Sequence, residues 1–323
     1  MRAAVLHQLG EAPKYEYFAD PIVKNENQIL ITVLAASVKN LDKGRASGKH
    51  YASHTNLPEV VGVDGVGILE DGSRVYASGI TGMIAEKALI DKNKYTLLPD
   101  HIDNITAAAL PNAVMGAALA LKYRAEMKAG DTVLINGATG VTGKVAIQIA
   151  RYYGAKKIIA TGRNADSLQL LTALGADEII SLQQEDQEII ELLKRIHDKN
   201  PIDIVIDYTW GHPAEIILNA LKEGGLHAIS HKVRFVSVGS MAGEEIRLSS
   251  GILRSSAIEI LGSGYGSLPK EAMEKQYTET IPEMMQLAAS GKLTIATVTA
   301  ELKDIETAWQ MDIPAGKRLV ILI

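Results

Sequence analysis

The fold of this chain is decided by residues 132–143, TVLINGATGVTG. The apolar run at 132–136 predicts a strand, and apolar residues at helical spacing over 144–153 predict a helix after the glycine-rich turn. Gly140 would let the backbone approach a pyrophosphate, and Gly143 would let the helix pack closely on the strand. The helix dipole and the amides of the first turn favour bound phosphate. We therefore expect a dinucleotide to bind at Ala138, Thr139, Gly140, Val141, Thr142 and Gly143.

The turn departs from the usual spacing, because Ala138 stands where the first glycine is expected and Gly137 lies just before it. A glycine triplet alone is also compatible with a tight turn in an unrelated loop. A second feature supports the dinucleotide, since the next apolar run ends in Gly162, Arg163 and Asn164. An NAD site usually has Asp or Glu here, whereas an arginine can bind a 2′-phosphate, so we expect NADPH. The alternative is that Arg163 is an ordinary solvated side chain.

Strand-like and helical runs alternate from residue 131 onward, which is the pattern of repeated βαβ units. The expected strands are residues 132–136, 157–161, 178–181, 202–207, 234–238 and 258–261, and the expected helices are 144–153, 166–174, 187–198 and 214–221. They suffice for an α/β fold with a doubly wound parallel sheet of the Rossmann type. Ligands bind at the carboxyl ends of such strands. We therefore expect the residues after the later strands to flank the cofactor: Asp207, Gly239, Gly262, Ser263 and Gly264.

The two ends of the chain differ from its middle. Residues 1 to 110 are β-rich, with short runs at 3–6, 29–35, 65–69, 74–77 and 85–90 and one helical stretch at 41–47. They predict a compact β-barrel-like domain. A helix at 270–290 precedes two further strands, 294–299 and 318–323, which we expect to return to that domain. The predicted domains are residues 1–115 with 267–323, and residues 116–266.

Composition restricts the classes of function. The 323 residues carry a formal net charge of −5 without a block of like charges, so no nucleic-acid surface is expected. There is no cysteine, which excludes disulfides, a cysteine nucleophile and thiolate metal sites. No signal-peptide core precedes His7. In the uncharged stretch 104–121 we expect two short buried helices that meet at Pro111, and no membrane span. The expected location is cytoplasmic.

Two pairs of histidines have spacings that a metal site can use, His50 with His54 and His227 with His231. We identify no carboxylate partner for the first pair in the sequence, and the second pair flanks a loop or strand. No metal is therefore expected at either pair.

Further stretches carry a resemblance to a known family. Residues 37–48, SVKNLDKGRASG, resemble its segment SxNxxDxxxRxG, residues 58–67, PEVVGVDGVG, resemble PxxxGxExxGxV, and residues 82–86, GMIAE, resemble GxxAE. Together with the glycine turn, in this order over the whole chain, they resemble the medium-chain dehydrogenase/reductase superfamily, in its zinc-free, zeta-crystallin-like quinone oxidoreductase branch. The resemblance implies a GroES-like β-barrel catalytic domain built from both chain ends, an inserted Rossmann domain, an active site in the cleft, and a homodimer or homotetramer.

The chain departs from this superfamily at positions that matter for chemistry. The zinc-dependent alcohol dehydrogenases have cysteines and a His-Glu pair around the metal, whereas this chain has Val63 and Asp64 at the pair. Without those ligands we expect no zinc-dependent alcohol oxidation. Lys39 stands where the family has Asn, and Asn40 where it has Pro. Lys39 could polarise a substrate carbonyl or contact a cofactor phosphate; the alternative is a solvated lysine before a short helix. Tyr51 lies where this branch often has a tyrosine.

The expected activity is zinc-independent hydride transfer from NADPH to a quinone. The carbonyl oxygen of the acceptor gains charge as the hydride arrives, so a hydrogen-bond donor lowers the barrier. The candidate catalytic residues are Tyr51, Lys39 and Asn40. Two alternatives stay open: reduction of α,β-unsaturated carbonyls (enals or enones), and a non-catalytic NADPH-binding protein with a sensing or structural role. Nucleic-acid binding, which some relatives show, is opposed by the acidic balance.

Overall fold

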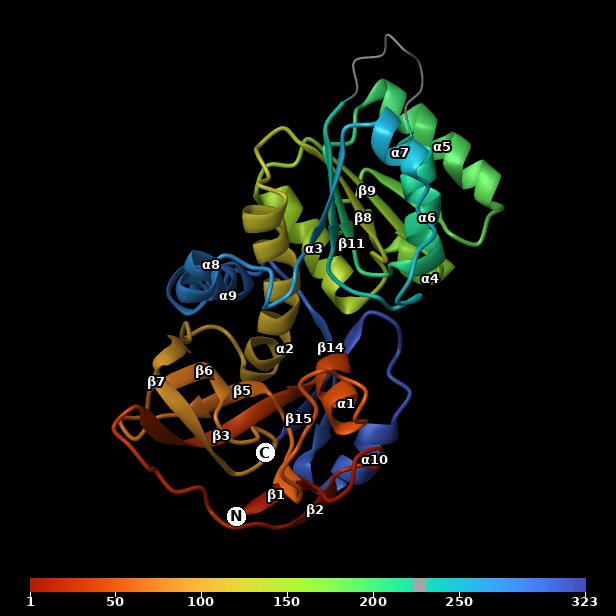
Figure 1. Ribbon diagram of the computed structural model, residues 1–323. Coiled ribbons are helices and arrows are strands. Elements are labelled where there is room, and N and C mark those ends of the chain that lie inside the picture. Colours follow the sequence, from red (N-terminus) through yellow and green to blue (C-terminus); the bar gives the residue numbers. More distant parts are fainter. Residues whose placement is uncertain (223–230) are drawn as a thin grey trace. The chain divides into compact units, whose positions relative to one another are not determined.

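The structure is a computed structural model that describes residues 1–222 and 231–323 (Figure 1). Its contacts group into two units. The barrel unit comprises Met1–Pro111 and Gln276–Ile323, and the parallel-sheet unit comprises Asn112–Lys275. The domain boundaries expected from the sequence, 115/116 and 266/267, stay a prediction. His227, of the second histidine pair, lies outside the described residues.

Six parallel strands form the sheet of the parallel-sheet unit, in the order β10-β9-β8-β11-β12-β13. This is the strand order of a doubly wound dinucleotide-binding fold, which confirms the predicted fold class. The strands are β8 (Thr132–Asn136), β9 (Lys157–Gly162), β10 (Glu178–Ser181), β11 (Ile204–Asp207), β12 (Val233–Ser237) and β13 (Ile258–Gly262). The helices are α3 (Val141–Tyr152), α4 (Ala165–Gln169), α5 (Asp186–Lys199), α6 (Gly211–Ala220) and α7 (Ser250–Ser255). The helix expected over 166–174 is wrong beyond Gln169, where turns follow.

Apolar strands make the core of this sheet. All residues of β8 are buried. Leu134, Val205 and Phe235 come from neighbouring strands and pack in one cluster with Leu193 of α5 and Ile217 of α6. Figure 1 shows α3 and α6 on opposite sides of the sheet, so both of its faces are covered. A strand that is buried on both faces has a continuous apolar sequence, which is why β8 could be recognised from the sequence alone.

The barrel unit contains a six-stranded sheet in the order β14-β15-β3-β5-β6-β7, in which β3 also pairs with β7. The additional pairing closes β3, β5, β6 and β7 into a small antiparallel barrel, as the sequence predicted. The bounds are β3 (Gln28–Val38), β5 (Asp64–Ile68), β6 (Arg74–Gly79), β7 (Lys87–Leu97), β14 (Ala296–Glu301) and β15 (Lys317–Leu322). Because β15 pairs antiparallel with β3, the end of the chain returns to its first strands.

Shorter elements complete the structure. A three-stranded sheet consists of β2 (Lys14–Tyr17), β1 (Arg2–Leu6) and β4 (Glu59–Val60). The helix expected over 270–290 is present as α8 (Lys270–Lys275), the π-helix η2 (Gln276–Thr280) and α9 (Ile281–Ala289) in direct succession. The remaining helices are α1 (Asn40–Ala46), the 3₁₀-helix η3 (Leu302–Asp304) and α10 (Ile305–Gln310). The sequence did not predict β2, β4, α7 or α10, because elements of two to six residues are too short to show a period.

The two short helices expected around Pro111 are wrong. The helix α2 (Asn104–Val114) contains Pro111 and continues directly into the π-helix η1 (Met115–Arg124). Proline removes one backbone hydrogen bond, and the helix changes its pairing after Val114 instead of ending. The span Asn104–Arg124 is long and apolar enough to cross a membrane by composition, but 67% of its most apolar window is buried in the structure, as in the core helix of a folded domain.

The apolar cluster of the parallel-sheet unit predicts the effect of truncating Phe235, whose side chain is fully buried and meets the Trp210 ring edge-on at 6.2 Å between centroids. We expect Phe235→Ala to lower the free energy of unfolding by about 3–5 kcal/mol. Leu170→Ala is the control, because Leu170 is 59% exposed and a surface truncation costs about 0.5 kcal/mol or less. Urea unfolding followed by circular dichroism measures both values. Equal losses in the two variants would contradict the assigned core.

Candidate functional site

The glycine turn between β8 and α3 is shaped by close backbone contacts. The Ala138 N–H donates to the Thr161 carbonyl oxygen at 2.8 Å, which holds the turn against the end of β9. Gly137 has a φ of +78°, where other residues are strained. A Cβ on Gly143 would lie 2.5 Å from Ala138 Cα and 2.7 Å from the Gly137 oxygen. Only glycine therefore lets the first turn of α3 come this close to the end of β8.

Gly140 has a different environment from Gly143. It is exposed and is the N-cap of α3, and a Cβ there would meet only the Gly137 oxygen, at 3.4 Å. The fold does not require a glycine at this position, whereas a ligand that approaches the backbone would. The N–H groups of the first turn of α3 have no partner within the helix, as in every α-helix, and the helix dipole adds positive potential there. The turn thus has the geometry and charge of an anion-binding site.

A chain of buried polar side chains joins the carboxyl ends of β9, β8 and β11. The Thr161 hydroxyl donates to Asn136 Oδ1 at 2.5 Å, and the Asn136 amide donates to Asp207 Oδ1 at 2.8 Å and Thr209 Oγ1 at 2.6 Å. Thr161, Asn136 and Asp207 have no exposed surface. Since the glycine turn begins directly after Asn136, this network fixes its starting point. We did not anticipate it, although a polar residue at the end of each apolar run was a visible signal.

Asp207 lies at the end of β11, as expected, but its side chain accepts hydrogen bonds from other groups of the protein. Its carboxylate accepts hydrogen bonds from the amides of Thr209 at 3.0 Å and Trp210 at 3.0 Å, besides the one from Asn136. Burial raises the pKa of the Asp207 carboxyl above its ordinary value, against these hydrogen bonds, which lower it. A carboxylate with its oxygens engaged in this way orders the strand end. Any contact between this residue and a cofactor would come from its backbone.

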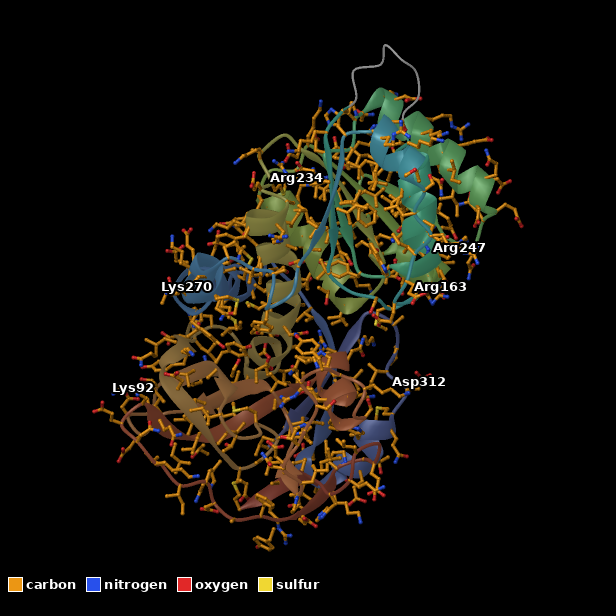
Figure 2. All side chains as sticks on the ribbon, in the orientation of Figure 1. Lys92, Arg163, Arg234, Arg247, Lys270 and Asp312 are labelled. Atoms are coloured by element: carbon orange, nitrogen blue, oxygen red, sulfur yellow. The ribbon has the colours of Figure 1, made fainter. Side chains whose placement is uncertain are left out.

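The expected 2′-phosphate segment follows β9. Gly162 is buried, and a Cβ there would lie 2.5 Å from Thr139 Cγ2 of the glycine turn, so the two predicted cofactor segments are neighbours. Arg163 is exposed after the end of β9 (Figure 2). Asn164 caps α4 by accepting a hydrogen bond from the Ser167 amide at 2.8 Å. The segment therefore presents one cation beside the turn and no carboxylate at the three positions after Thr161.

The other predicted cofactor residues also lie at the carboxyl edge of the sheet. Gly239 follows β12, and a Cβ there would lie 2.9 Å from the Tyr208 oxygen. At the end of β13, Ser263 donates its amide to the Ser237 oxygen at 2.8 Å, and Gly264 donates its amide to Ser267 Oγ at 2.9 Å. Gly262 is the last residue of β13 and is exposed. The fold thus brings these residues to the edge where parallel sheets bind ligands.

In the barrel unit, Lys39 is buried, so the alternative of a solvated lysine is wrong. It is 2% exposed and precedes α1. Its ammonium lies 2.7 Å from Asp64 Oδ1, 2.8 Å from the Ser37 carbonyl oxygen and 3.1 Å from Asp42 Oδ2. Burial lowers the pKa of Lys39, but the carboxylates of Asp42 and Asp64 outweigh it and leave this pKa above its ordinary value. Asp64 was missed as a partner because nothing in the sequence links positions 25 residues apart.

The other two catalytic candidates are exposed. Asn40 begins α1, and Tyr51 lies beyond that helix with 88% of its surface exposed and its ring 4.2 Å from the His50 ring. The structure places Lys39 and Asn40 side by side in the chain but leaves Tyr51 out of the buried cluster around Lys39. The catalytic roles of all three stay predictions.

One histidine of each pair, His54 and His231, forms an ion pair with a carboxylate. His54 pairs with Glu59 at 2.8 Å, so the expectation that the first pair has no carboxylate partner is wrong; Glu59 lies just beyond Pro58 and folds back. His231 pairs with Asp203 at 2.8 Å. Within residues 1–222 and 231–323, no group of three His, Asp or Glu side chains is arranged to hold a metal ion.

Comparison with known proteins identifies the family. Residues 141–290 match the family model described as "Zinc-binding dehydrogenase". The pig (Sus scrofa) protein named quinone oxidoreductase is 31% identical over 283 residues, which cover 84% of this chain and 78% of the pig protein. The chain belongs to the quinone oxidoreductase family. This family is the predicted branch of the medium-chain dehydrogenase/reductase superfamily, so the resemblance is confirmed.

Two further comparisons describe proteins to which the chain is similar. The Arabidopsis thaliana protein named NADPH-dependent alkenal/one oxidoreductase is 34% identical over 221 residues, 62% of this chain and 54% of that protein. The structure of the quinone oxidoreductase from Thermus thermophilus, described with its NADPH complex, matches with a TM-score of 0.78 at 24% identity and covers 100% of both chains. At that identity the structural likeness shows the fold alone.

The glycine turn predicts distinct effects of two substitutions. We expect Gly143→Ala to lower the Tm and to weaken NADPH binding, because the added methyl group collides with backbone atoms of the turn. We expect Gly140→Ala to leave the Tm unchanged, because its methyl group meets no protein atom closer than 3.4 Å. It should still weaken NADPH binding, because the methyl group would obstruct a ligand that approaches the backbone. Thermal unfolding and fluorescence titration with NADPH measure the two effects. A Gly143→Ala variant that unfolds and binds like the unmodified chain would contradict the close approach of α3.

Proposed function

We propose that the protein is an NADPH-dependent reductase that transfers a hydride to a quinone without zinc. The observation that carries the proposal is the glycine turn after β8 with the exposed Arg163 beside it. Membership of the quinone oxidoreductase family supports it. The cofactor supplies the difficult chemistry, a hydride from C4 of its reduced nicotinamide ring. The residues of this chain bind, orient and stabilise charge.

The chain offers three sets of groups for such a cofactor. Residues 138–143 would bind the pyrophosphate through backbone amides, and Gly162, Arg163 and Asn164 would accommodate the 2′-phosphate on the adenosine ribose. An arginine presents two parallel donors to a phosphate, whereas the carboxylate of an NAD site would repel it. The strand-end residues Asp207, Gly239, Gly262, Ser263 and Gly264 would flank the nicotinamide ribose and ring with backbone groups.

For the acceptor, we propose Tyr51 and Asn40 as the donors to the oxygen that gains charge. Both side chains are exposed, so a small molecule can reach them. The phenol of Tyr51 and the amide of Asn40 are neutral donors, and a neutral donor is sufficient where water can protonate the product. Lys39 is less suited to this role, because its ammonium is already surrounded by acceptors of the protein.

Enals and enones are the alternative acceptors. The likeness to the Arabidopsis alkenal/one oxidoreductase favours them, since its 34% identity exceeds the 31% of the pig quinone oxidoreductase, although over a shorter span. A second alternative, a non-catalytic NADPH-binding protein with a sensing or structural role, rests on the replacement of the family's Asn by Lys39. We further propose a cytoplasmic location and a homodimer or homotetramer, as the family resemblance implies.

Arg163 gives a test of the cofactor. We expect NADPH to support a higher kcat/KM than NADH, and Arg163→Asp to reduce kcat/KM for NADPH about 10- to 100-fold, the range of one lost charge-assisted hydrogen bond plus repulsion. Arg163→Lys is the matched control: it keeps the charge but loses the paired donors, so an intermediate value is expected. Equal use of NADPH and NADH by the unmodified protein would refute the preference for NADPH.

The acceptor is tested by a panel. We expect NADPH oxidation with 1,2-naphthoquinone at a higher kcat/KM than with small enals such as 2-hexenal, read as the fall of absorbance at 340 nm. Tyr51→Phe should lower kcat with the quinone more than it changes the Kd of NADPH, since it removes one donor and leaves the parallel-sheet unit unaltered. A preference for enals would favour the first alternative. Tight NADPH binding without oxidation by any acceptor would favour the non-catalytic one.

A further inference from the structure

We infer that Lys39 is a positioning residue, an internal counter-ion that keeps the start of α1 docked on the first residues of β5, and that it donates no hydrogen bond to a substrate. The inference rests on the proposed function only for its activity readout. The geometry around the ammonium carries it. Four acceptor atoms lie within 3.2 Å of Lys39 Nζ: Asp64 Oδ1, the Ser37 carbonyl oxygen, Asp42 Oδ2 and Ser37 Oγ. An ammonium has three hydrogens, so this one has no donor capacity left for a ligand.

The carboxylates that surround Lys39 are themselves fully engaged. Asp42 Oδ1 accepts from the Val63 amide at 2.9 Å, and Asp42 Oδ2 accepts from the Lys39 amide at 2.8 Å. Asp64 Oδ2 accepts from the Tyr76 hydroxyl at 3.1 Å. Asp42 belongs to α1, Val63 precedes β5, Asp64 is the first residue of β5, and Tyr76 belongs to β6. With Ser37 on β3, the network therefore ties one helix to three strands of the barrel, with the ammonium at its centre.

The charges in this network balance. Arg318 on β15 is 8% exposed and is attracted electrostatically to both Asp64 and Asp42. Two cations thus accompany two carboxylates in a region where each ion loses most of its hydration. A buried ion pair contributes little net stability, but removal of one partner leaves an uncompensated charge, which is strongly destabilising. The Lys39 ammonium is thus needed because Asp42 and Asp64 would otherwise repel each other and open the contact between α1 and β5.

The contact between α1 and β5 should therefore tolerate the neutralisation of Lys39 only if Asp64 is neutralised as well. Replacing Lys39 with an uncharged residue should weaken the contact between the start of α1 and β5. Neutralising Asp64 in the same chain should restore that contact. A lysine that acts directly on a substrate would behave differently, because no change at its counter-ion could replace the lost donor. The double variant separates a positioning role from a catalytic one.

The experiment compares Lys39→Met, Asp64→Asn and the double variant Lys39→Met with Asp64→Asn, each in the full chain. Readouts are the Tm, the Kd of NADPH, and kcat and KM with 1,2-naphthoquinone. We expect Lys39→Met to lower the Tm and to reduce kcat/KM about tenfold or more, and the double variant to recover the Tm and most of kcat/KM. The Kd of NADPH should change less than about twofold throughout, because the glycine turn belongs to the other unit. Lys43→Met, on the same helix but outside this network, is the matched control and should alter none of the readouts.

Three results would overturn the inference. A double variant that regains the Tm but stays as inactive as Lys39→Met would make Lys39 a catalytic donor. A Lys39→Met variant with unchanged Tm and activity would show that the network positions nothing. If neither Lys39→Met nor the double variant folds, neutralisation does not compensate the loss, which contradicts the charge argument. If the unmodified protein reduces no quinone, the proposed function fails, whereas the Tm comparison still decides whether Lys39 and Asp64 are coupled.

Discussion

The close approach of α3 to the turn that ends β8 is the contact on which the rest of the parallel-sheet unit depends. A Cβ on Gly143 would lie 2.5 Å from Ala138 Cα, so the helix can take this place only because Gly143 has no side chain. The contact aims the amino end of α3 at the edge where the strands end, and it leaves Gly140 exposed at that edge. Positive helix potential, open backbone and the cation of Arg163 are thereby brought to one side of the sheet.

Both units order their candidate sites with buried polar side chains. In the parallel-sheet unit, Asn136 links Thr161 to Asp207 across three adjacent strands, and no cation is needed because the carboxylate is surrounded by amide and hydroxyl donors. In the barrel unit, Asp42 and Asp64 have fewer such donors, and the Lys39 ammonium compensates their negative charge. The same requirement, that a buried charge must be compensated, is thus met by dipoles in one unit and by an ion in the other.

Much of this fold could be predicted because its signals are local. The buried strand β8, the glycines after it and the alternation beyond it indicated the parallel sheet, and short β-prone runs indicated the barrel. Where partners lie far apart in the sequence, prediction failed. For Lys39 the sequence left a role at substrate or cofactor and a solvated side chain open and did not predict a buried network, since Asp64 is 25 residues away and Arg318 is near the other end of the chain. Pro111 suggested a break, but the buried helix absorbs the lost hydrogen bond and continues as η1. The position of the candidate cofactor residues at the carboxyl edge of the sheet could be predicted, whereas the polar network behind them could not.

In the proposed function, the glycine turn and Arg163 hold a cofactor that gives up a hydride to a quinone. Single-turnover oxidation of bound NADPH by 1,2-naphthoquinone, with hydrogen or deuterium at C4 of the nicotinamide, measures this step directly. Oxidation of the bound NADPH should require the quinone. It should be slower for the deuterated cofactor, because the bond from C4 to hydrogen breaks in the transfer. Bound NADPH that persists in the presence of the quinone, or that is oxidised equally fast with either isotope, would contradict it.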